Sequence, residues 1–171
     1  MKKFWNMMAM TLLMAGSAMV VSCDNDDDQD DSRDGGASRI AGVYTGGLSG
    51  KVMTVDVSFD DVYDVQIIDE KDADNDEVTV VLPECSFSNA AMPALMTIHA
   101  VTVPDVDVER SKSDSNTYLL EKDSFEATVG GVVYKGSVSG RINGTKAVLN
   151  YTLTPGSMPM PINFTFTGEL K

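Results

Sequence analysis

Beyond residue 40, apolar and polar residues alternate along most of the chain. From Ala147 to Leu153 and from Ile162 to Phe166, every second residue is apolar and the residues between them are mainly polar. A repeat of two residues is that of a β-strand with one buried face. Valine, isoleucine and threonine, which favour strands, are also frequent here. The pattern therefore predicts an all-β fold.

Turn-forming residues separate these runs and set the number of strands. Asn143-Gly144 predicts a tight hairpin, and Asp60-Asp61 and residues 72–76 predict further turns. The predicted strands cover residues 41–49, 51–59, 62–69, 77–87, 94–103, 117–120, 125–134, 135–142, 146–154 and 162–170. Short connections between consecutive strands predict an antiparallel meander. About 8–10 such strands close into a single β-barrel, because closure leaves no strand edge exposed.

The first 23 residues have the parts of a bacterial lipoprotein signal. Lys2 and Lys3 precede an apolar stretch that ends in Val-Val-Ser and then Cys23. This arrangement predicts that residues 1–22 are a signal peptide and that Cys23 becomes the acylated first residue, carrying palmitate-type chains. The alternative is a retained membrane helix, but about 18 apolar residues barely cross a hydrocarbon core of about 30 Å. We therefore expect a membrane contact through an N-terminal lipid.

An acidic segment follows the lipid-bearing cysteine. Seven aspartates lie between residues 24 and 34, and no large apolar residue interrupts them. Such a block repels itself, so residues 23–39 are predicted to form a lipidated, flexible stalk. Acidic residues in this place also resemble the surface-export signal of lipoproteins in one lineage of Gram-negative bacteria, although they can equally serve only to keep the stalk solvated.

The charge of the chain excludes one class of partner. Removing the leader leaves 11 basic against 26 acidic side chains, a net charge of −15. Nucleic acid binding depends mainly on lysine and arginine at phosphates, so we expect no nucleic acid partner.

Three short segments carry a resemblance to a known family. They are Gly42-Val43-Tyr44, Phe87 and the run from Gly140 to Thr145. In these segments the chain resembles the calycin-like β-barrel lipoproteins, and the resemblance covers nearly all of residues 40–170. The barrel domain is predicted to span residues 40–171. With the lipid signal, the resemblance implies a barrel domain anchored at the outer membrane, at the cell surface or facing the periplasm. We expect this domain to be a monomer. Tyr44 stands where the wider calycin group, which includes the lipocalins, has tryptophan.

An eight-stranded barrel is either filled by side chains or holds one small ligand. The residues predicted to face inward also include Met53, Val55, Met96 and Ile98. The candidate ligand-binding residues are the inward aromatic side chains Tyr44, Phe59, Tyr134, Tyr151, Phe164 and Phe166. Two alternatives follow for this binding or accessory domain: a carrier of a small apolar ligand, or a structural or host-facing interaction protein with a solid barrel.

Catalytic and metal chemistry have little support in the sequence. His99 is the only histidine, and it is predicted to lie on a strand surface, while Cys85 is predicted to be a small buried hydrophobe. Asp72, Asp74 and Asp76 are the weak metal candidates, because alternate carboxylates can converge on a hard cation. A solvated hairpin turn is the favoured interpretation of that segment. We therefore predict neither an enzyme nor a cofactor.

Overall fold

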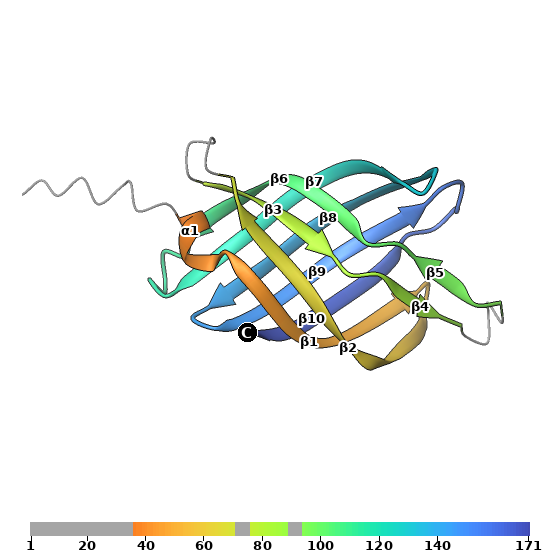
Figure 1. Ribbon diagram of the computed structural model, residues 1–171, viewed down its shortest axis with the longest axis horizontal. Coiled ribbons are helices and arrows are strands. Elements are labelled where there is room, and N and C mark those ends of the chain that lie inside the picture. Colours follow the sequence, from red (N-terminus) through yellow and green to blue (C-terminus); the bar gives the residue numbers. More distant parts are fainter. Residues whose placement is uncertain (1–35, 71–75, 89–93) are drawn as a thin grey trace, which may run out of the picture. The chain divides into compact units, whose positions relative to one another are not determined.

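The computed structural model describes residues 36–70, 76–88 and 94–171, which belong to one unit of the chain. Eight strands form a closed barrel in which every neighbouring pair is antiparallel (Figure 1). Their order around the barrel is β1-β10-β9-β8-β7-β6-β3-β2. The bounds are β1 (Gly42–Val52), β2 (Val55–Asp69), β3 (Glu77–Leu82), β6 (Val101–Arg110), β7 (Thr117–Val129), β8 (Val132–Asn143), β9 (Lys146–Pro155) and β10 (Ile162–Leu170). The predicted all-β barrel is confirmed.

Two further elements lie at the ends of this barrel. The short helix α1 (Gly36–Ile40) precedes β1, and the strands β4 (Cys85–Phe87) and β5 (Met96–Ile98) pair as a separate two-stranded sheet. Figure 1 shows α1 at one end of the barrel and β4–β5 at the other. No helix of the described residues has the length and apolar character needed to cross a membrane.

The first turn of the barrel differs from the sequence prediction. β1 and β2 meet at Met53, which has a φ of 57° and is 60% exposed, so the prediction that it faces inward was wrong. The prediction of a turn at Asp60-Asp61 was also wrong, because β2 continues through these residues. Phe59 and these two aspartates stand opposite Leu48 alone, as a β-bulge within β2. A bulge bends the strand without ending it, and here it leaves both carboxylates exposed.

The turn between β7 and β8 was also misplaced by the sequence pattern. It lies at Gly130 and Gly131, whose φ values are 59° and 80°. A two-residue hairpin with positive φ at both positions selects glycine, since other residues are strained there. The predicted strands 117–120 and 125–134 are therefore one irregular strand up to residue 129, and the rest belongs to β8.

The hairpin predicted at Asn143-Gly144 is present but begins one residue later. Asn143 still pairs with Lys146, so the loop consists of Gly144 and Thr145. Gly144 has a φ of 57° at the first loop position, where a primed turn with glycine requires it.

β3, β4, β5 and β6 form one long hairpin that is interrupted near its middle. Leu82 pairs with Val101 and Cys85 pairs with Ile98, so the register is the same on both sides of the break. Pro83 lies in the break, and proline has no amide hydrogen to continue a ladder. The predicted strands 77–87 and 94–103 are each divided here. The buried face changes across the break, which turns the β4–β5 sheet inward over the end of the barrel.

Candidate functional site

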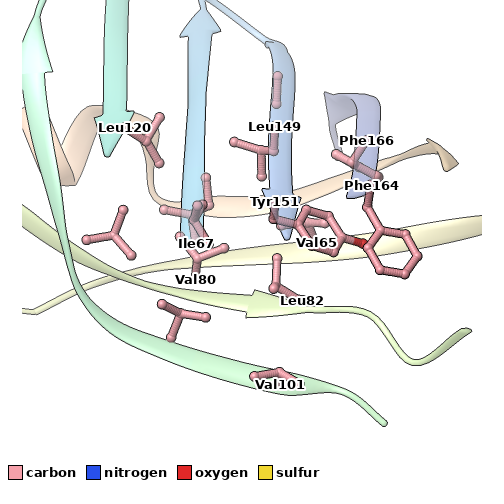
Figure 2. Packing of buried hydrophobic residues seen from close by; sticks show 14 of the residues in the cluster. Val65, Ile67, Val80, Leu82, Val101, Leu120, Leu149, Tyr151, Phe164 and Phe166 are labelled. Carbon is pink, nitrogen blue, oxygen red and sulfur yellow. The ribbon is translucent and has the colours of Figure 1, made fainter. Parts of the chain in front are cut away.

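Five aromatic side chains gather inside the barrel at its β4–β5 end. We call them the aromatic cluster: Phe59, Tyr63, Phe87, Tyr151 and Phe164. The rings of Tyr151 and Phe164 stack with centroids 4.9 Å apart and 17° between their planes, and Figure 2 shows them side by side. Phe59 contacts Phe164 at 6.0 Å, and Tyr63 and Phe87 meet Phe59 edge-on at 5.9 and 5.8 Å. Stacked and edge-to-face pairs are the favourable geometries of aromatic rings.

Strand register explains how the cluster forms. Tyr151 on β9 and Phe164 on β10 are direct cross-strand partners, and both point into the barrel. Phe59 comes from the bulge in β2, which aims its ring at Phe164. Phe87 arrives on β4 from the end of the barrel. The cluster therefore joins the barrel wall to the β4–β5 sheet that covers it.

The hydroxyl of Tyr151 is a buried polar atom of this cluster that lacks a hydrogen-bond partner among the described residues. The side chain is 3% exposed. Burial, with smaller contributions from Cys85 and Tyr63, raises the pKa of Tyr151 far above its ordinary value. An unpaired buried hydroxyl costs about 1–3 kcal/mol. The hydroxyl is thus a position where a polar atom of another molecule would be stabilising.

The other candidate ligand-binding residues have structural roles. Tyr44 is fully buried at the α1 end, where Oη donates to the carbonyl of Ile40 at 2.9 Å, and burial raises its pKa. The hydroxyl of Tyr134 accepts a hydrogen bond from the amide of His99 at 3.2 Å. Phe166 is fully buried in the barrel core (Figure 2). The aromatic cluster therefore contains three of the six predicted residues, and the other three make no ring contact with it.

The remaining inward predictions divide by their place in the strands. Ile98 is buried as predicted, whereas Val55 and Met96 are half-buried near the ends of their strands.

Cys85 and His99 lie close in the fold but do not form a thiol–imidazole pair. Cys85 is buried, and burial together with the nearby Glu84 carboxylate raises the pKa of its thiol to about 12. His99 lies in the link between β5 and β6, not on a strand as predicted, and its Nδ1 is 3.3 Å from Oε2 of Glu84. This contact joins the two links that lead into and out of the β4–β5 sheet.

The metal candidates find no support in the part of the chain that the structure describes. Asp72 and Asp74 lie outside the described residues, as does Cys23. Asp76 is exposed, and its carbonyl oxygen accepts a hydrogen bond from the amide of Val108 at 2.6 Å. Within residues 36–70, 76–88 and 94–171, no three histidine, cysteine or acidic side chains are grouped for a metal ion.

A groove on the outer face of the barrel was not predicted from the sequence. It has a volume of about 580 Å³ and crosses β7, β8 and β9. We call it the Arg141 groove, and its lining residues include Ser113, Asp114, Leu119, Arg141, Asn143 and Val148. Two other outer grooves are a more acidic one of about 510 Å³ on β6 and β7, and one of about 460 Å³ on β1, β2 and β10.

Comparison with known proteins agrees with this architecture. Residues 40–169 match the family of calycin-like β-barrel domains, which is more than half of the chain. The chain belongs to this family. A solved structure of a "putative outer membrane protein" from Bacteroides fragilis superimposes on this calycin-like barrel with a TM-score of 0.61 and 22% sequence identity. The match covers 78% of the chain but 52% of that protein, so the chain spans about half the length of its structural neighbour. A search of curated proteins gave no significant match.

The sequence pattern alone gives little indication that the residues of the Arg141 groove lie together in this calycin-like barrel. Arg141 occupies an outward position of β8 between two inward residues, as an ordinary solvent-facing charge does. Its apolar neighbours Leu119 and Val148 come from other strands. The juxtaposition needs the strand register, which the sequence pattern did not supply.

Proposed function

We propose that this chain is an outer-membrane lipoprotein whose solid barrel is a binding module that contacts its partner through its outer face. The leader with Cys23 and the acidic segment after it support the lipid anchor and exposure at the cell surface. The fold is also that of the "putative outer membrane protein" from Bacteroides fragilis, which supports a location at the outer membrane. The proposed role is binding without catalysis.

The burial of the inward side chains is the observation that supports a solid barrel. Inward side chains of all eight barrel strands belong to one buried cluster, and α1 and the β4–β5 sheet contribute further side chains at the two ends. Side chains that pack at crystal-like density leave no room for a second molecule. The grooves described above instead lie on the outer face, so binding is expected there.

Native mass spectrometry of the protein extracted from its own membrane tests the solid barrel. We expect ligand-free protein and no response from an apolar fluorescent dye. The Phe164→Ala variant supplies the control, because truncating a large buried ring leaves an apolar cavity that can admit a small molecule. Dye binding by the wild type at the level of this variant would contradict a filled interior.

The anchor has a separate test. Cys23→Ser should abolish incorporation of labelled palmitate, because the thiol is the acylation site; equal labelling of both proteins would disprove lipidation. Added protease should cleave the wild type on intact cells, and changing Asp26, Asp27 and Asp28 to lysine should reduce that cleavage. Wild-type protein that is shielded from protease would show that it faces the periplasm.

A carrier of a small apolar ligand is the second candidate, favoured by the unpartnered Tyr151 hydroxyl. Such a ligand would displace the β4–β5 sheet and accept a hydrogen bond from Oη. Tyr151→Phe keeps the ring and removes this donor. If the carrier function is correct, wild-type protein retains a ligand by native mass spectrometry and the variant loses it. Absence of ligand from both proteins would rule the carrier out.

A further inference from the structure

The Arg141 side chain differs from the other basic side chains that the structure describes in having no partner among the described residues. Its guanidinium makes no ion pair or hydrogen bond with the residues that the structure describes. The other described basic side chains each have an ion pair, a hydrogen bond or another electrostatic interaction: Arg39, Lys51, Arg110, Lys112, Lys122, Lys135, Lys146 and Lys171. The chain has twice as many acidic as basic side chains, yet none of the described acidic side chains pairs with this guanidinium.

The place of Arg141 in the sheet sets what surrounds it. It pairs directly with Leu119 on β7 and with Val148 on β9, so its side chain lies between two apolar neighbours on the outer face. Leu119 is 41% exposed. The Arg141 groove therefore has an apolar floor on both sides of a planar cation, which is suited to bind a carboxylate with two parallel hydrogen bonds.

The other end of the groove is polar and held in place. The Asp114 carboxylate accepts hydrogen bonds from the amide of Asn116 at 3.0 Å, from Thr117 Oγ1 at 2.8 Å and from Asn143 Nδ2 at 2.8 Å. These bonds lower the pKa of Asp114, with that from the Asn116 amide the largest. The fixed Asp114 carboxylate has lone pairs to spare for accepting hydrogen bonds from hydroxyl groups, and the Ser113 hydroxyl beside it can donate one.

We propose that the Arg141 groove binds a sugar that carries a carboxylate, of the hexuronic acid type. Arg141 binds the carboxylate, Leu119 and Val148 contact the C–H face of the ring, and Asp114 with Ser113 binds its hydroxyls. The volume of about 580 Å³ is in the range of small-molecule sites. A fatty acid would leave the polar end unmatched, and a neutral sugar would leave Arg141 unpaired.

The surrounding charges favour one carboxylate over a polyanion. Glu109 pairs across the sheet with Leu119 but is partly neutralised by Lys112 at 3.6 Å, and Lys146 at the polar end has Glu169 at 3.8 Å. Arg141 thus provides a local site for a single negative charge on a surface that repels larger anions. This inference rests on the proposed outer-face binding.

Ligand-observed NMR on the purified full chain, in a detergent without sugar groups, tests the site. Glucuronate is the probe, and glucose and hexanoate each lack one of its two recognised features. We expect saturable transfer to glucuronate and at least tenfold weaker binding of the other two. Arg141→Gln should weaken glucuronate binding at least tenfold, because the loss of one charged hydrogen bond alone accounts for about that factor and the guanidinium can make two.

Lys51→Gln is the matched control, because Lys51 lines a different outer groove and is paired with Asp56 at 3.3 Å. It should bind glucuronate as the wild type does. Both variants should have the melting temperature of the wild type. Equal binding of hexanoate or glucose, or unchanged binding by Arg141→Gln, would overturn the assignment. If glucuronate fails to bind while the barrel interior proves solid, this inference falls and the proposed function does not.

Discussion

The hydroxyl of Tyr44 donates a hydrogen bond of 2.9 Å to the carbonyl oxygen of Ile40. It connects the first strand of the barrel to the last residue of α1, across the end of the barrel that α1 covers (Figure 1). Ile40 itself is buried in the same core. The bond therefore satisfies a buried hydroxyl and a helix carbonyl that has no partner farther along the helix.

Removing this bond should cost stability, whereas the same change at Tyr151 should not. Tyr44→Phe leaves the Ile40 carbonyl without its partner, so we expect a loss of about 1–2 kcal/mol in the free energy of unfolding. Tyr151→Phe removes a hydroxyl that has no partner among the described residues, so its stability should be unchanged or higher. Urea unfolding of both variants compares them directly. A larger loss at Tyr151 would mean that its hydroxyl has a bound partner.

Neighbouring glycines in β1 should respond to alanine in opposite ways. A Cβ at Gly46 would lie 2.0 Å from the carbonyl oxygen of Thr167, where backbone atoms must move apart. At Gly47 nothing lies within 4 Å of such a Cβ. Gly46→Ala should therefore destabilise the barrel by several kcal/mol, about the upper range for overpacking, while Gly47→Ala stays within about 0.5 kcal/mol. Thermal unfolding measures both, and equal melting temperatures would contradict the close approach of β1 and β10.

Phe164 should contribute more to stability than Leu170, the last residue of the same strand. Its ring is buried between Tyr151 and Phe59, so Phe164→Ala is expected to cost about 3–5 kcal/mol. Leu170 lies on the same strand and is 38% exposed. Leu170→Ala should cost less than half as much in chemical unfolding. Comparable losses would indicate that the aromatic cluster is loosely packed.

The Cys85 thiol should make the protein less stable in alkali. Its pKa is raised from 9.0 to about 12 in the folded state, so the folded protein keeps a proton that the unfolded chain releases. The associated stability is complete below pH 9 and declines by about 1.4 kcal/mol per pH unit between pH 9 and 12. Unfolding of the wild type and Cys85→Ala should show a stability difference that shrinks as the pH rises above 9. A constant difference would contradict the buried, protonated thiol.

The sequence pattern predicted the fold because successive side chains of a strand point to opposite faces. When one face is buried, apolar residues must therefore recur at every second position. Tyr151 and Leu153 on β9, and Phe164 and Phe166 on β10, are buried as the alternation indicated. The errors occurred where an element does not follow this repeat. Two consecutive aspartates at Asp60-Asp61 predicted a turn, but a β-bulge also exposes consecutive polar residues.

The candidate site was only partly predictable for a related reason. Alternation identifies which residues face inward, but not how far along the barrel axis each one lies. Tyr44 and Tyr151 have the same sequence signature and are placed near opposite ends by the register of their strands. Phe87 could not be assigned to the cluster, since its position depends on the break at Pro83.

The closing pair of the barrel joins its first strand to its last, with Tyr44 opposite Leu170. The described chain thus begins and ends at the same end of the barrel (Figure 1). There the amide of Lys171 donates to the carbonyl of Val43 at 2.9 Å. A reporter or affinity tag fused after Lys171 would emerge beside α1. Such a tag would leave the β4–β5 end of the barrel uncovered. A circular permutant could join residues 36 and 171 through a short linker and have its new termini at the exposed turn of Met53.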